Sequence, residues 1–192
     1  MDETEELVDA LSPVVTALKD LGVRHYIGGS VASSFHGATR STMDVDIICE
    51  LSQANISQLI ALIGSEFYAS ESAMRDAVRR KACFNLIHLP TSFKIDVFVS
   101  RGRPFDIEAM ERACLQRLGE GRFVEVPVAT AEDSIISKLE WYRLSNEKSE
   151  RQWDDVSRLL DLLGDDADGE YLRLAAQSVG VEDLLERIMN PR

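Results

Sequence analysis

Residues 28–47 of the chain read GGSVASSFHGATRSTMDVDI, and this stretch decides the fold. It directly follows residues 23–27 (VRHYI), which form a short β-rich run. Gly28 and Gly29 allow a tight turn and the close approach of a phosphate to the backbone. Ser30 opens a short helical run, so its hydroxyl lies at a helix N-terminus, where anions are favoured. The pattern predicts a phosphate-binding turn between a strand and a helix.

Two carboxylates lie at the end of the same stretch. Asp44 follows Ser30 by fourteen residues, and Asp46 lies two residues further on. Residues two apart in a strand project from the same face, so both carboxylates point to one side and Val45 to the other. A pair of carboxylates beside a phosphate-binding turn is a suitable donor set for a divalent metal ion and a triphosphate. Taken alone, Asp44 also fits an exposed acid where a strand begins.

A third acid lies in an apolar strand farther along the chain. Residues 93–99 (FKIDVFV) alternate, with Lys94, Asp96 and Phe98 on one face. A lone charge inside such a strand is costly, so Asp96 needs a partner. Two functional interpretations remain open: Asp96 completes a site for a pair of Mg²⁺ (or Mn²⁺) ions, about 4 Å apart, or it takes the proton of an attacking hydroxyl. The structural alternative is an ion pair with an arginine.

This combination of motifs resembles the nucleotidyltransferase superfamily with the polymerase-beta-like fold. The string over residues 28–47 is most similar to the small prokaryotic branch, which includes minimal nucleotidyltransferases and abortive-infection-type toxin nucleotidyltransferases. The resemblance covers roughly residues 20–100 by motif and the later part of the chain more loosely. It implies an α+β core with a mixed β-sheet, an NTP donor, and Mg²⁺ or Mn²⁺ held by Asp44, Asp46 and Asp96.

The resemblance extends to the helical tail, where the toxin-like enzymes carry a lysine and an aspartate. Here it points to Lys138 and, with Asp154 as the competing choice, to Asp155. Lys138 shares a helix face with Ile135, so it either reaches the phosphates of the NTP or covers apolar surface with its stem. Arg151 lies four residues before Asp155, and a pair between them is expected; the alternative is an ordinary surface ion pair worth under ~1 kcal/mol.

Two further basic features are candidates for phosphate contacts. Arg40 directly precedes the acid pair, and its guanidinium suits the geometry of a triphosphate. The alternative for Arg40 is a solvated loop arginine. The segment 75–81 carries three arginines and a lysine, which either guide a nucleotide or an acceptor or form a solvated helix face.

The organisation changes along the chain. Strands dominate the first two thirds, so residues 1–129 are expected to form the catalytic core and residues 130–192 a C-terminal helical segment packed on it. Helices are expected over 131–145, 150–163, 168–178 and 181–189. A hairpin is expected from strands over 83–89 and 93–99.

Other elements are expected on weaker signals. An N-terminal helical stripe contains Pro13, which predicts a kink or a second start. Ser52 is expected to cap a helix that ends at Gly64. A helix is expected over 105–118, and residues 122–128 read as an edge strand because Pro127 suits an edge.

Composition limits the class of protein. The chain has 192 residues, 45% of them hydrophobic, which predicts a globular fold. Its net charge of −12 argues against non-specific binding to duplex DNA. The three cysteines have no CxxC spacing and are expected to be reduced and mostly buried, as in the cytoplasm. The acidic start is unlike a signal peptide, and no apolar run approaches the ~20 residues that span a bilayer, so no membrane partner is expected.

The resemblance implies an enzyme that moves an NMP from an NTP, with its triphosphate over Gly29 and Ser30, to a hydroxyl acceptor and releases pyrophosphate. Three acceptors remain open: the 3′ end of an RNA, a protein, or a small molecule such as an aminoglycoside. The alternative is a non-catalytic nucleotide-binding or partner-binding module, for example a toxin–antitoxin component. A cognate antitoxin and a second copy of the chain are further expected partners.

Overall fold

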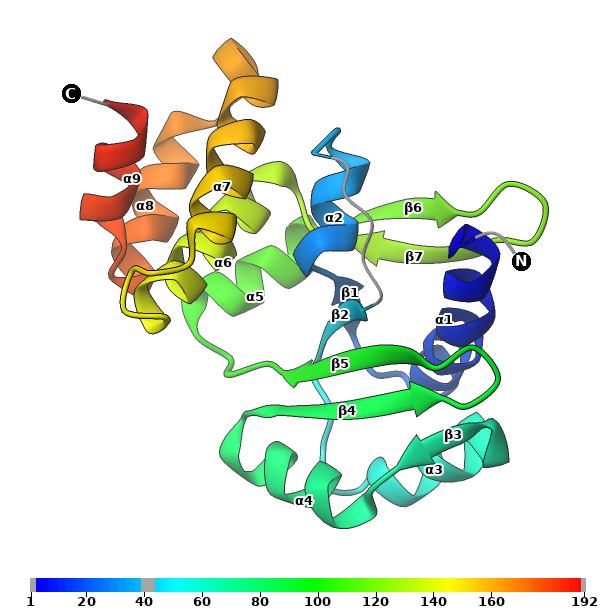
Figure 1. Ribbon diagram of the computed structural model, residues 1–192. Coiled ribbons are helices and arrows are strands. Elements are labelled where there is room, and N and C mark those ends of the chain that lie inside the picture. The colour runs from blue at the N-terminus through cyan, green and yellow to red at the C-terminus, as the bar shows by residue number, and fades with distance from the viewer. Residues whose placement is uncertain (1–2, 39–43, 191–192) are drawn as a thin grey trace.

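The computed structural model describes residues 3–38 and 44–190 of the chain (Figure 1). Within these residues a seven-stranded mixed sheet is flanked by helices, which confirms the α+β prediction. The strands are β1 (His25–Ile27), β2 (Asp44–Cys49), β3 (Phe67–Ala69), β4 (Cys83–His88), β5 (Phe93–Val99), β6 (Cys114–Leu118) and β7 (Val124–Val128). Their order in the sheet is β3-β4-β5-β2-β1-β7-β6.

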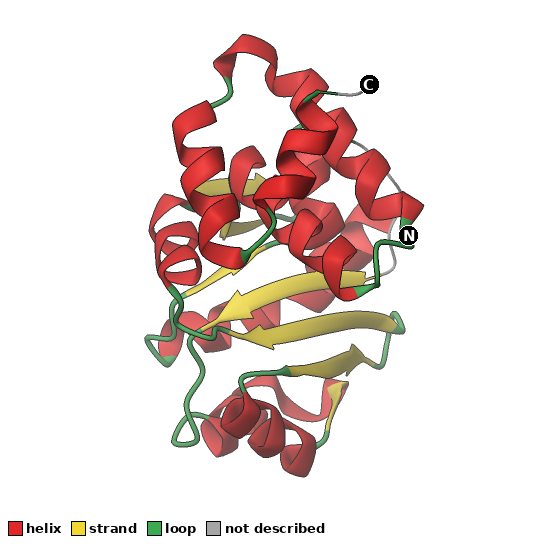
Figure 2. Cartoon of the chain, turned by 90° about the vertical axis from the view of Figure 1, so that its left-hand side faces the viewer, coloured by secondary structure: helices red, strands yellow, loops and turns green. Residues whose placement is uncertain are grey.

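Helices of the described residues flank this sheet. They are α1 (Glu3–Asp20), α2 (Gly29–Phe35), α3 (Ile56–Ile63), α4 (Glu71–Arg80), α5 (Pro104–Arg112), α6 (Ala131–Leu144), α7 (Glu150–Leu163), α8 (Gly169–Val179) and α9 (Glu182–Met189). Figures 1 and 2 place α3 and α4 at one end of the molecule and the group α6–α9 at the other, with the strands between them. The described helices include none that is long and apolar enough to cross a membrane.

The two central strands, β2 and β5, set the two faces of the sheet. They run parallel, with Asp46 opposite Asp96. Along both strands buried and half-buried residues alternate. Ile47 and Ile95 are fully buried in the main hydrophobic core, to which α1 also contributes. The acids lie on the opposite, half-buried face, where polar side chains remain accessible.

Most elements occur where the sequence predicts them. The hairpin of β4 and β5 is confirmed, with Asn85 opposite Asp96 in its register. The helices α6, α7, α8 and α9 are confirmed to within two residues at each end. The second helix start considered at Pro13 is wrong, because α1 continues through this residue, and the kink stays a prediction. Leu11, Val14 and Leu18 of α1 are fully buried, and burial of this kind offsets the cost of about 3 kcal/mol for a proline inside a helix.

The segment between α5 and α6 corrects two predictions. The expected helix over 105–118 ends at Arg112, and residues 114–118 form β6, because they pair antiparallel with β7, which lies beyond the range of the expected helix. The prediction that residues 122–128 form an edge strand is also wrong, since β7 lies between β1 and β6. β1 and β7 pair through a single residue pair, Ile27 with Val128. There is thus no extended ladder on that side in which the missing N–H of Pro127 would cost a hydrogen bond.

Three smaller points complete the comparison. The residue that caps α3 is Asn55, to which Ser52 donates a hydrogen bond, so Ser52 is not the cap. Of the cysteines, Cys49 is buried but Cys83 and Cys114 are exposed, contrary to expectation. The strand β7 ends and α6 begins on either side of the predicted boundary at 129/130, which stays a prediction about domains.

Candidate active site

The turn that joins β1 to α2 is built against β2. The amide of Gly28 donates a hydrogen bond to the carbonyl of Asp46, with N···O 2.9 Å. Gly29 has φ +59°, and a Cβ placed there would overlap Oδ2 of Asp46. A Cβ on Gly28 would lie 2.6 Å from Cδ1 of Ile48. Gly29 is therefore required for close packing, whereas a side chain at Gly28 would only displace the end of Ile48, and the side chain of Asp46 lies directly against the turn.

The three predicted acids lie together on one face of the sheet. Asp44 and Asp46 project from β2, and Asp96 projects from the neighbouring strand β5, directly opposite Asp46. The side chain of Asp44 is 41% exposed, whereas that of Asp96 is 15% exposed. The cluster therefore runs from an open rim at Asp44 to a sheltered position at Asp96.

The carboxylate of Asp96 is held by two neighbours. Nζ of Lys94 donates to Oδ2 of Asp96 at 2.8 Å, and Nδ2 of Asn85 donates to Oδ1. Lys94 also lies 3.9 Å from Oδ2 of Asp44. The partner is thus a lysine on the same strand and not the arginine that the structural alternative invoked. Alternation in β5 already places Lys94 on this face, and the hairpin register places Asn85 there, so both were open to prediction.

The environment of Asp46 favours its protonated form. Burial, together with the neighbouring carboxylates of Asp44 and Asp96, raises the pKa of Asp46 from 3.8 to about 6, although the ammonium groups of Lys138 and Lys94 act to lower it. The hydrogen bond to Asp96 raises the pKa of Lys94, which keeps its ammonium charged. The cluster thus carries more negative charge than its own cations neutralise, and a further cation would relieve the repulsion.

Helices α6 and α7 contribute a second polar layer. Nζ of Lys138 donates to Oδ2 of Asp155 at 2.8 Å, and these side chains are 6% and 13% exposed. Nη2 of Arg151 donates to Oγ of Ser30 at 3.3 Å. The expected pair of Arg151 with Asp155 is therefore corrected: each has a different partner. Asp154, the competing choice for the aspartate, is exposed on α7.

The remaining basic candidates differ in what the structure shows. Arg40 lies outside the described residues. The arginines of α4 pair with acids of their own helix: Arg75 with Glu71 at 2.6 Å, and both Arg79 and Arg80 with Asp76. This arrangement fits the solvated helix face, with each arginine paired to an acid of its own helix.

The acid pair on β2 is chemically suited to a divalent metal ion. Asp44 and Asp46 offer hard carboxylate oxygens from one strand face, which are the ligands that Mg²⁺ and Mn²⁺ prefer. Burial and then the neighbouring acids raise the pKa of Asp46, and a cation bound at this face would favour its ionised form. Among residues 3–38 and 44–190, however, no three His, Cys, Asp or Glu side chains are grouped so as to hold a metal ion. Asp96 as a third ligand stays a prediction.

An aromatic pair that the sequence analysis did not single out borders the acids. Phe98 follows Asp96 by two residues on the same face of β5. Its ring meets that of Trp141 edge-on, with 5.7 Å between centroids, and Trp141 is 48% exposed on α6. The pair joins the sheet to the helical segment and provides an apolar surface next to the cluster.

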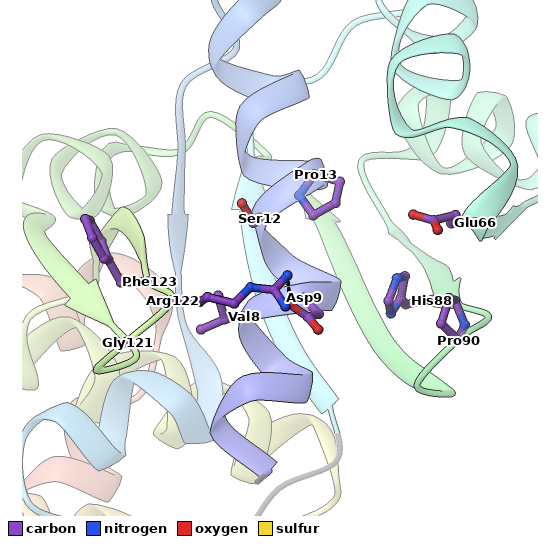
Figure 3. A pocket seen from close by; sticks show the side chains of 10 residues that line it. All are labelled: Val8, Asp9, Ser12, Pro13, Glu66, His88, Pro90, Gly121, Arg122 and Phe123. Atoms are coloured by element: carbon purple, nitrogen blue, oxygen red, sulfur yellow. Dashed lines mark ion pairs between the residues drawn. The ribbon is translucent and has the colours of Figure 1, made fainter. Parts of the chain in front are cut away.

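A separate hollow of about 550 Å³ lies between α1 and the turns that follow β4 and β6 (Figure 3). It is lined by Val8, Asp9, Ser12, Pro13, Glu66, His88, Pro90, Gly121, Arg122 and Phe123. Asp9 and Arg122 form an ion pair at its centre. None of the residues that line this hollow is among the predicted site residues, so the chemistry must be sought at the acids.

Comparison with known proteins rests on structure. No protein-family model matches the sequence, and no curated protein is significantly similar to it. An antigenic nucleotidyltransferase-like protein from Paracoccidioides brasiliensis superposes with a TM-score of 0.55 at 17% identity, over 96% of this chain and 93% of that one. The antibiotic-resistance factor ANT(2'')-Ia in solution gives 0.55 at 14% identity, over 99% of this chain and 100% of that one.

The crystal structure of ANT(2'')-Ia in complex with adenylyl-2''-tobramycin gives a TM-score of 0.56 at 13% identity, over 90% of this chain and 96% of that one. These likenesses span nearly the whole of each chain, so the helical segment is included in the match. At this level of identity they establish the fold, and the chemistry has to be argued from the site.

Proposed function

We propose that this chain, whose fold is that of nucleotidyltransferase-like proteins, transfers an NMP from an NTP to a hydroxyl acceptor and releases pyrophosphate. The observation that carries the proposal is the contact between Gly29 and Asp46. A carboxylate of the acid pair fills the space that the glycine leaves, so the phosphate-binding turn and the metal-binding acids form one structural unit. A plain strand-to-helix turn would not need this match.

The turn and its neighbours would bind the triphosphate. The triphosphate lies over Gly29 and Ser30. Arg151, which donates a hydrogen bond to Ser30, provides a cation at the same position. Arg40 and Lys138 are further proposed phosphate contacts. Asp44 and Asp46 would hold Mg²⁺ or Mn²⁺, which supplies Lewis-acid stabilisation of the charge that develops on the phosphates.

Asp96 is the proposed base. The acceptor oxygen forms a bond to the α-phosphorus of the NTP, the bond from that phosphorus to the bridging oxygen breaks, and pyrophosphate leaves. The proton of the acceptor hydroxyl passes to the carboxylate of Asp96, whose orientation Lys94 and Asn85 fix. The protein forms no covalent bond to the nucleotide, and its contribution is positioning and charge stabilisation.

A small cationic molecule is the acceptor that the properties of this chain favour. The net charge of −12 attracts cations and repels the phosphates of RNA. The acceptor side of the site offers Asp96 and the exposed Trp141, and a half-exposed aromatic face beside carboxylates suits an organic cation. One structural neighbour was solved with adenylyl-2''-tobramycin, a small-molecule product.

The test is a product assay with each of the four NTPs, Mg²⁺ and a panel of acceptors that includes aminoglycosides, tRNA and unrelated proteins. We expect pyrophosphate to be released with a small-molecule acceptor, and an Asp44→Asn/Asp46→Asn variant to release none while its circular dichroism is unchanged. Release of orthophosphate would indicate a hydrolase. Nucleotide binding without either product, across the whole panel, would indicate a non-catalytic module.

A further inference from the structure

The ammonium of Lys94 lies between carboxylates of the two neighbouring strands that carry the acids. Its ammonium lies 2.8 Å from Oδ2 of Asp96 on its own strand and 3.9 Å from Oδ2 of Asp44 on β2. Lys94 is also the register partner of Asp44, so the backbone fixes where its side chain starts. A metal ion that bridged Asp44 and Asp96 would occupy the same position as the ammonium of Lys94.

Both oxygens of Asp96 already have donors. Oδ2 accepts from Lys94, and Oδ1 accepts from Asn85 on the other neighbouring strand, β4. A metal ion bound by Asp96 would have to compete with these two donors for the lone pairs. Asp46, in contrast, contacts the glycine turn. Among the ion pairs of the described residues, none joins a cation to Asp46 in the way that Lys94 is joined to Asp96.

The charges of the cluster agree with a single metal ion. Asp44, Asp46 and Asp96 carry three negative charges when ionised, and Lys94 supplies one positive charge. Lys138 is already neutralised by its ion pair on α7. Counted over these described side chains alone, one divalent cation balances the cluster, whereas a second one would leave it with an excess of positive charge before any nucleotide binds.

We propose that Lys94 is the built-in second cation of this site, so that the protein binds one divalent metal ion, at Asp44 and Asp46, and keeps Asp96 free of metal. This inference rests on the proposed function. Lys94 is then a positioning residue: it holds the carboxylate of Asp96 toward the acceptor and supplies the positive charge that a second metal ion would otherwise bring.

The test counts Mn²⁺ ions bound per chain by isothermal titration and by electron paramagnetic resonance of free Mn²⁺, with no acceptor present. The variants are Lys94→Met, which removes the charge, and Lys94→Arg, which keeps it. Lys148→Met is the matched control, because Lys148 is exposed in the loop between α6 and α7. The side chain of Lys94 is 44% exposed, so its replacement should leave the fold intact, as circular dichroism would verify.

We expect one Mn²⁺ in the wild type, in Lys94→Arg and in Lys148→Met, and two in Lys94→Met. Addition of Asp96→Asn to Lys94→Met should remove the second ion, which locates it at Asp96. Two ions in the wild type, or one ion of unchanged affinity in Lys94→Met, would overturn the role of Lys94 but leave the proposed function intact. If no variant bound Mn²⁺, both the inference and the proposed metal site would fail.

Discussion

At the scale of single residues, the candidate site depends on the absence of a side chain at Gly29. Its φ of +59° and its contact with Oδ2 of Asp46 are two separate requirements for glycine. The sequence motif predicts a tight turn here, but it gives no sign that a carboxylate from β2 fills the same space. The position of Asp46 is therefore set by a residue with no side chain.

Gly29→Ala separates these two requirements when it is compared with Gly22→Ala. Gly22 has φ +64° and has no neighbouring atom within 4 Å of an added Cβ, so its substitution costs only backbone strain, about 1–2 kcal/mol. Gly29→Ala should carry a similar cost and also displace Asp46. We expect both variants to lose stability in urea unfolding but Gly29→Ala alone to lose Mg²⁺-dependent NTP binding. Equal binding by the two variants would contradict the contact.

Asp46 makes stability depend on pH in a direction that can be derived. Its pKa rises from 3.8 in the unfolded chain to about 6 in the folded protein, so the folded state holds the proton more tightly. This carboxyl therefore contributes less stability as the pH rises from about 4 to 6, and its ionised form costs about 1–3 kcal/mol above pH 7.

Asp46→Asn removes this cost. The variant should match the wild type near pH 4 and exceed it in free energy of unfolding by about 1–3 kcal/mol above pH 7, measured by urea unfolding across this range. Asp154→Asn, at an exposed position, is the control and should show no such divergence. Lower stability of Asp46→Asn at neutral pH would show that Asp46 does not carry a raised pKa.

At the scale of secondary-structure elements, the ion pair of Lys138 with Asp155 ties α6 to α7 beside the site. Both side chains are largely buried, so each charge has the other as its partner away from solvent. Lys138 also lowers the pKa of Asp46, so the pair links the helical segment to the acids electrostatically.

Lys138→Met should cost about 3–5 kcal/mol in free energy of unfolding, because it leaves the carboxylate of Asp155 buried without a partner. The double variant Lys138→Met/Asp155→Leu should recover most of this loss. If Lys138 reaches the NTP as proposed, the double variant should regain stability without regaining nucleotide affinity. Arg24→Met, which breaks an exposed pair with Glu50, is the control and should have a far smaller effect. An equally small loss for Lys138→Met would contradict a structural role for the pair.

The elements also show what can be predicted from sequence. Alternation and hydrophobic stripes located β2, β4, β5 and the C-terminal helices because their own residues carry the pattern. The pattern failed at β6, which is a strand because it pairs with β7, and at Pro127, because β7 also pairs with the distant strand β1. It also missed β3, whose three residues are too few to show alternation. Alternation in β5 placed Lys94 beside Asp96, whereas Asn85 required the register of the β4–β5 hairpin to be read as well.

At the scale of the whole molecule, the two faces of the sheet differ in their surroundings. One face is buried in the hydrophobic core, and the other carries the acids of β2 and β5. The start of α2 meets α7 through the hydrogen bond from Arg151 to Ser30. The solved structures that superpose over nearly the full chain show that this arrangement is a known fold, although sequence identity is at most 17%. The glycines and acids alone predicted that fold, whereas the acceptor depends on loops and surfaces with no comparable signature.

The most direct test of the central claim is isothermal titration of the four NTPs, with and without Mg²⁺, into the wild type and into Asp44→Asn/Asp46→Asn. We expect the wild type to bind at least one NTP in a Mg²⁺-dependent manner and the double variant, folded by circular dichroism, to lose this binding. Mg²⁺-dependent binding of equal affinity by both proteins would contradict the account, because the acid pair on β2 would then play no part in holding the nucleotide.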